Sequence, residues 1–221
     1  MKSIKNQFPF IKGFTIAVTF SMLLLIIRII RVESIFFMFL AWNLFLACIP
    51  YGITLILSFR KLHKNRFLFG MGFLIWLVFL PNSPYILTDL QHIRISSLQS
   101  IWFDVLLIVS FAINGLIVGF ASLRIMQQLL CDYFSKKVTY IITYTVLLLC
   151  GFGIYLGRVL RWNSWDIVNN PMGILGDIAQ RILFPMNHIN TWSFTIGFGG
   201  FLIITYHLIQ YYQQLYLKQE D

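Results

Sequence analysis

The stretch LPNSPYILTDLQH, residues 80–92, interrupts an apolar run that would otherwise look like one membrane-spanning helix. The run before the break, residues 67–80, is 14 residues long. That is about 21 Å of helix, whereas the hydrocarbon core of a bilayer is about 30 Å thick, so we expect the break inside the outer leaflet. Pro81 and Pro84 each remove a backbone donor, and freed backbone groups in a membrane must face other helices or a wet cavity. The stretch therefore predicts a polar, protein-lined site.

A second helix is expected after the break, with Ser83 as its cap and Pro84 at its first position. Four polar side chains then fall at i, i+3, i+4 and i+7, which is one helical face, opposite three apolar ones. We take Asp89 and His92 as candidate catalytic residues, and Asn82 and Tyr85 as candidate substrate-binding residues. Two alternatives stay open: the stretch is only the hydrated end of a kinked span, or Asp89 pairs with a distant arginine for structural reasons. The polar face comprises Tyr85, Thr88, Asp89 and His92, and the apolar side Ile86, Leu90 and Ile93.

The composition excludes a soluble domain. The chain has 221 residues, of which 58% are hydrophobic and 11% charged, and its mean hydropathy is +0.77. Soluble domains carry roughly 25% charged residues. The net charge of +9 lies in short loops between apolar runs, so it indicates membrane topology rather than a nucleic-acid partner.

Six apolar segments are long enough to cross a membrane. We therefore expect an all-α polytopic transmembrane helix bundle, with a broken third helix and an interfacial amphipathic helix before the last span, as a single integral-membrane domain over residues 1–221. The first segment follows three lysines without a small-residue cleavage site, which predicts an uncleaved signal anchor. The expected spans are residues 13–32, 35–59, 67–88, 101–123, 138–157 and 191–214.

The basic residues predict the orientation. A cytoplasmic N-terminus places 11 of the 17 Lys and Arg residues on the inner side, as the positive-inside rule favours. We expect a protein integral to the cytoplasmic (plasma) membrane, with both termini in the cytoplasm.

A second motif, GRVLRWNSWD, occupies residues 157–166 just beyond the fifth expected span. Arg158 and Arg161 stand three apart, and two neighbouring guanidinium groups can hold a phosphate or a carboxylate. We take both arginines and Asp166 as candidate substrate-binding residues. The alternative is an interfacial anchor, in which the arginines reach lipid phosphates and the tryptophans sit among the headgroups.

The interfacial helix is expected after Asn170, a capping residue followed by Pro171. Four isoleucine and leucine residues recur at helical spacing on one face, while Asp177 and Arg181 stand on another. Pro185 would end the helix. The apolar face comprises Ile174, Leu175, Ile178 and Ile182.

Asp104, at the start of the fourth expected span, is a further candidate substrate-binding residue. A carboxylate within the membrane needs a cation or a hydrogen-bond network, and Arg158 and Arg161 are expected on the same side. We expect no metal and no cofactor, because no HExxH or CxxC pattern, glycine-rich phosphate loop or nucleophile elbow occurs.

The two motifs, with Trp102 and Asp104 and with WNLFLACIP at residues 42–50, resemble the bacterial multi-pass membrane proteins called domain of unknown function 1361. The resemblance extends over most of the chain from about residue 40. It implies an integral-membrane protein and implies no activity.

The leading hypothesis is one polar site at the outer face for an anionic lipid headgroup or a small anion. The arginines would bind the anion, and Asp89 and His92 would form an acid and base pair, as in a membrane transferase or hydrolase acting on lipid-linked substrates. The alternatives are a transporter or channel, and a non-catalytic accessory subunit of a membrane complex. Membrane lipids are the expected partners, without nucleic acid. The sequence specifies neither substrate nor oligomeric state. The site would gather Asp89, His92, Asp104, Arg158, Arg161 and Asp166.

Overall fold

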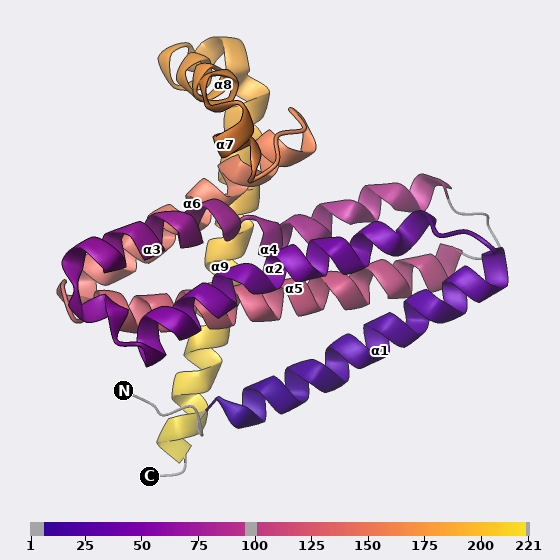
Figure 1. The fold of residues 1–221 in the computed structure, drawn as a ribbon, viewed down its shortest axis with the longest axis horizontal. Coiled ribbons are helices and arrows are strands. Elements are labelled where there is room, and N and C mark those ends of the chain that lie inside the picture. The colour runs from indigo at the N-terminus through magenta and orange to yellow at the C-terminus, as the bar shows by residue number, and fades with distance from the viewer. Residues whose placement is uncertain (1–6, 96–100, 220–221) are drawn as a thin grey trace. The chain divides into compact units, whose positions relative to one another are not determined.

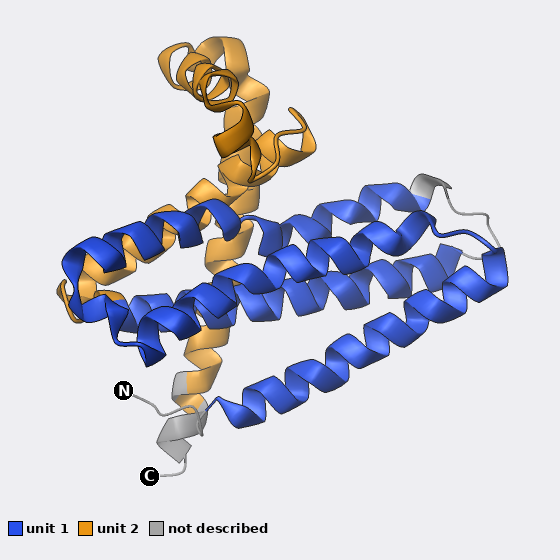
Figure 2. Cartoon of the chain, in the orientation of Figure 1, with its two compact units in different colours: residues 1–129 blue, residues 130–221 orange. Residues whose placement is uncertain are grey.

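The computed structural model describes residues 7–95 and 101–219, which form helices with no strand among them. In these residues six helices are long and apolar enough to cross a membrane. The expected all-α, multi-span architecture is therefore confirmed. The chain divides into two compact units, residues 1–129 and 130–221 (Figure 2). The single domain expected from the sequence stays a prediction.

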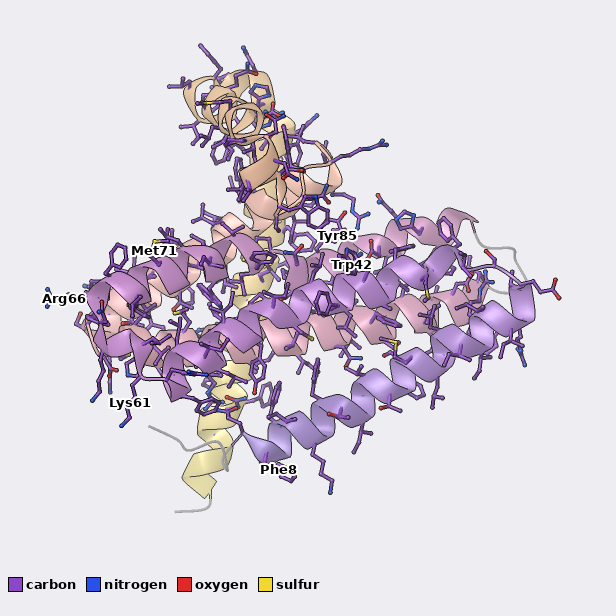
Figure 3. The ribbon with its side chains drawn as sticks, viewed as in Figure 1. Phe8, Trp42, Lys61, Arg66, Met71 and Tyr85 are labelled. Atoms are coloured by element: carbon purple, nitrogen blue, oxygen red, sulfur yellow. The ribbon has the colours of Figure 1, made fainter. Side chains whose placement is uncertain are left out.

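Unit 1 is built around α2, which packs against α3 and α4. One end of the unit gathers the end of α1, the start of α2, the end of η4 and the start of α5 (Figure 1); we call it the polar end of unit 1. The basic α2–α3 connection, with Lys61 and Arg66, lies at the opposite end (Figure 3). The elements are α1 (Phe8–Val32), η2 (Phe36–Met38), α2 (Phe39–Phe59), η3 (Leu62–Lys64), α3 (Arg66–Phe79), α4 (Asn82–Tyr85), η4 (Ile86–Ile95) and α5 (Ile101–Leu130).

The third span is broken as expected, and the break packs tightly inside unit 1. A Cβ on Gly115 would lie 2.5 Å from the carbonyl oxygen of Ser83, and one on Gly119 would lie 2.6 Å from the Ser83 Cβ. The two glycines of α5 therefore let the backbone of α4 approach closely. The expected capping role of Ser83 is wrong: α4 begins at Asn82 without a side-chain cap. The Ser83 hydroxyl instead donates to the carbonyl of Ala47 in α2, at 3.0 Å.

The segment after the break winds as a 3₁₀ helix, not as the expected α-helix. A 3₁₀ helix has three residues per turn, so side chains three apart align. Asp89 and His92 therefore stay on one face. Ile86 joins their row and is fully buried, so its expected place on the opposite side is wrong.

Unit 2 is a pair of long helices, α6 and α9, that pack against each other. A Cβ on Gly151 of α6 would lie 2.7 Å from the carbonyl oxygen of Thr195, and one on Gly199 would lie 2.9 Å from Leu148 Cα. Glycine at the crossing thus permits close packing of two spanning helices. The elements are α6 (Lys136–Arg158), α7 (Asp166–Asn169), α8 (Pro171–Leu183), η5 (Pro185–His188) and α9 (Ile189–Gln219).

The helix expected after Asn170 is present as α8. The Asn170 side chain accepts a hydrogen bond from the backbone N–H of Gly173 at 3.1 Å, which is the expected cap. The expected apolar face is divided, however. Ile174 is buried beside Arg181, whereas Leu175 and Ile182 are exposed.

Candidate functional site

The carboxylate of Asp89 lies at the polar end of unit 1 and is 1% exposed. Asn43 of α2 donates from its amide nitrogen to Oδ2 of Asp89 at 3.0 Å. His92, one 3₁₀ turn further along η4, places Nε2 4.0 Å from the other oxygen. Because the hydrogen bond comes from a different helix, the carboxylate has a fixed orientation.

His92 lies at the edge of this cluster. Its side chain is 27% exposed, and its ring contacts those of Phe36 and Phe39, with centroid distances of 5.9 and 5.1 Å. The imidazole is thus accessible on one side and held by aromatic rings on the other. A buried carboxylate behind a partly exposed histidine is an arrangement in which the acid can orient the base.

Asp104, the first acidic residue of α5, is fully buried and pairs with Arg28 of α1. Arg28 Nε and Nη2 donate to the two oxygens of the carboxylate, the second at 3.0 Å. The guanidinium also lies over the ring of Phe37, 5.4 Å from its centroid. The structure thus gives Asp104 a partner that the sequence did not predict, an arginine of the first helix. A pairing of Asp104 with Arg158 or Arg161 stays a prediction. The signal for it was an arginine inside an apolar span, which is a functional candidate by default.

Asn82 and Thr88 satisfy backbone groups at the break. The Asn82 amide donates to the carbonyl of Phe79 at 2.9 Å, and the Thr88 hydroxyl donates to that of Tyr85 at 2.6 Å. Carbonyls left by a broken helix need such donors in a membrane. Tyr85 is half-buried and lies midway along unit 1 (Figure 3). A substrate-binding role for Asn82 and Tyr85 stays a prediction.

Arg158, Arg161 and Asp166 belong to unit 2. Helix α6 ends at Arg158, and Arg161 adopts a left-handed conformation with φ of 63°. The two arginines therefore do not share a helical face, because the chain has left the helix between them. Asp166 accepts hydrogen bonds from the backbone and the side chain of Asn163, at 2.7 and 3.3 Å.

A polar cluster of unit 2 was not expected from the sequence. Trp162 Nε1 donates to Oδ2 of Asp177 at 2.7 Å, and Arg181, 6% exposed, holds Oδ1 at 2.9 Å. The indole of Trp192 in α9 donates to the carbonyl of Arg181 at 3.1 Å. The cluster fastens α8 to α9 and to the connection before α7. The i, i+4 spacing of Asp177 and Arg181 was visible in the sequence, but the tryptophan donors were not.

We expect Trp162→Phe to lower the free energy of unfolding by about 1.5 kcal/mol, because it removes a hydrogen bond to a charged group. The measurement is denaturant unfolding of the full chain in detergent micelles. Trp165→Phe is the matched control, since Trp165 is exposed, and its effect should stay within about 0.5 kcal/mol. Equal losses in the two variants would contradict the role of the indole hydrogen bond.

The structure thus joins Asp89 with Asn43 and His92, and Asp104 with Arg28, in unit 1. A single pocket that also contains Arg158, Arg161 and Asp166 stays a prediction, since those residues lie in the other unit. In the described parts of the chain, no group of three or more His, Cys, Asp or Glu side chains could hold a metal ion.

The chain matches one protein-family model, described as "Protein of unknown function (DUF1361)", over residues 42–205. The matched region contains Asn43, Asp89, His92 and Asp104. No curated protein and no solved structure matches the chain.

Proposed function

The chain belongs to the DUF1361 family, because the family model matches most of its length; no activity is described for that family. We propose that the protein is a membrane-embedded transferase or hydrolase acting on a lipid-linked substrate. Asp89 and His92 form its acid–base pair. His92 exchanges a proton with the reacting group, and Asp89 orients and stabilises the imidazolium that forms.

One observation carries this proposal: a carboxylate 1% exposed, held by Asn43, faces a histidine that is still partly accessible. Histidine is the side chain whose ordinary pKa is nearest neutrality, so it can serve as acid or base at physiological pH. The 4.0 Å between Nε2 and Oδ1 exceeds a hydrogen bond by about 1 Å. The proposed role requires the two groups to come closer in the complex with substrate, as catalytic hydrogen bonds often do.

The location of the pair favours a lipid-linked substrate. Asp89 and His92 belong to the helical stretch Arg66–Ile93, which is apolar enough to cross a membrane. Ionisable side chains are rare in such stretches and mark functional sites. A substrate carried on a lipid can bring its reacting group to this depth, whereas a hydrated solute must first lose its water.

Anion binding is a separate part of the proposal and rests on unit 2. Arg161 is exposed, and its left-handed conformation presents it on a turn rather than along a helix. An exposed guanidinium can pair with a phosphate oxygen of a lipid headgroup. Arg161→Gln should therefore weaken retention of phosphatidylglycerol by the purified protein.

The test follows lipid composition by mass spectrometry over time in nanodiscs that contain the full chain, phosphatidylethanolamine and phosphatidylglycerol. We expect new lipid products with the natural sequence, and a rate about a hundredfold lower in His92→Ala and Asp89→Asn. Gln91→Ala is the matched control, since Gln91 is the exposed neighbour between them in the sequence. Rates that survive both substitutions would overturn the acid–base role. Solute flux into vesicles that depends on Asp89, without any lipid product, would favour a transporter instead.

A further inference from the structure

Residues 166–190 carry an apolar surface without exposed charge. Their charged side chains are Asp166, Asp177 and Arg181, and none of the three is exposed. A water-facing surface would present roughly 25 to 35% charged residues. Eight apolar side chains of the segment are instead more than half exposed: Val168, Met172, Leu175, Ile182, Leu183, Phe184, Met186 and Ile189.

On α8 four of these side chains and the exposed Ala179 form one stripe, which we call the outer face of α8: Met172, Leu175, Ala179, Ile182 and Leu183. Spacings of three and four residues place them on one side of a helix. The opposite side carries Ile174 and the Asp177–Arg181 pair, which Trp162 and Trp192 hold. The two charges are thus paired with each other away from the outer face, which is left wholly apolar.

We propose that the outer face of α8, continued by Phe184 and by Met186 of η5, lies in the boundary between the headgroups and acyl chains of one membrane leaflet. This inference does not depend on the proposed catalytic function. It also gives the polar cluster of unit 2 a role: the contacts of Asp177 and Arg181 hold the polar side of α8 away from the lipid.

The short length of α8 and its connection to two spanning helices favour lipid over a protein partner. The 13 residues of α8 make about 20 Å of helix, too short to cross the hydrocarbon core. The segment connects α6 to α9, two helices of spanning length, so its ends are tied to the level at which the chain leaves the membrane. Helices with one apolar face lie in the interface in this situation.

The absence of exposed charge decides which lipid is needed. Interfacial helices that select anionic lipid carry Lys or Arg on their solvent side, and the segment exposes none. Burial of apolar side chains is then the driving force, and it does not depend on headgroup charge. Neutral phosphatidylcholine should suffice.

The test uses spin labels on the full chain in phosphatidylcholine nanodiscs, with Cys48 and Cys131 replaced by serine and Cys150 by alanine. Labels are placed in turn at Leu175→Cys and Ile182→Cys. We expect dissolved oxygen, which concentrates in acyl chains, to relax both labels more than a water-soluble nickel chelate does. Gln180→Cys is the matched control: it is exposed but lies to the side of the stripe, and the order of the two reagents should be reversed there. Adding phosphatidylglycerol should change none of these results.

A stronger effect of the nickel chelate at Leu175 and Ile182 would overturn the proposal, because it would place the stripe in water. Exclusion of both reagents would overturn it too, because it would indicate a protein partner. A photo-crosslinking amino acid at Leu175, in the chain with its natural cysteines, provides an independent readout. A crosslink to phosphatidylcholine supports the proposal, and a crosslink to protein alone contradicts it.

Discussion

Asp104→Ala is expected to lower the free energy of unfolding by about 3 to 5 kcal/mol, because it leaves the guanidinium of Arg28 buried without its counter-ion. Asp104 is fully buried and Arg28 is 8% exposed, so water cannot replace the carboxylate. The same bond joins α1 to α5, and α1 has few other buried side chains. Denaturant unfolding of the full chain in detergent micelles measures the loss.

The control replaces both partners at once. Arg28→Met with Asp104→Leu removes the charges together and fills the space with apolar groups, a change that is often neutral or stabilising for a buried pair. We expect the double variant to unfold within about 1 kcal/mol of the natural protein. If the double variant lost as much stability as Asp104→Ala, the loss would come from packing and not from the ion pair.

The sequence predicted well those elements that depend on residues close together in the chain. Pro81 and Pro84 each lack the backbone N–H that a continuous α-helix would need, so a break near them followed from residue identity. Asn170 and Pro171 likewise begin α8 through interactions within four residues. The six spans followed from hydropathy, which depends on composition alone.

The features that the sequence did not predict depend on contacts between distant segments. Arg28 and Asp104 are 76 residues apart, and no local pattern selects Arg28 from the arginines expected on that side. The 3₁₀ winding of η4 is a small departure from the α-helix that tertiary packing decides. Arg161 left its expected helical face because α6 ends three residues before it, and helix ends are the least certain feature of a pattern.

The candidate site likewise combines residues that the sequence predicted with one that it did not. Asp89 and His92 were selected because they follow a break inside an apolar run, and both helical types keep residues three apart on one face. Asn43 was not selected, since an asparagine in a span more often joins helices by hydrogen bonds. It does so here, but the group that it binds is the carboxylate of the acid–base pair. A structural hydrogen bond and a site contact are thus one interaction.

Gly115→Ala is expected to lower the free energy of unfolding by about 2 to 3 kcal/mol. The new Cβ would lie 2.5 Å from the Ser83 carbonyl oxygen and 2.9 Å from the Ile86 side chain, and overpacking of this kind costs about 1 to 3 kcal/mol. The upper part of that range applies because a backbone atom next to Pro84 cannot rotate away. Unfolding in detergent micelles measures the effect. Gly52→Ala is the matched control: a Cβ there meets nothing within 4 Å, so it should stabilise α2 by about 0.5 to 1 kcal/mol.

Variants at the neighbouring glycine, Gly119, distinguish the loss of a specific contact from a general loss of packing. At Gly119 the added carbon would meet the Ser83 side chain, at 2.6 Å from Cβ and 3.2 Å from Oγ, instead of a carbonyl. Ser83→Gly removes both of these atoms, so it should restore part of the stability lost in Gly119→Ala. It should restore nothing in Gly115→Ala, because glycine keeps the carbonyl. Ser83→Gly alone removes the hydrogen bond to Ala47 and defines the baseline for both comparisons. Equal rescue of the two alanine variants would show that α4 does not pack on α5 in this register, and the position of Asp89 would then need another cause.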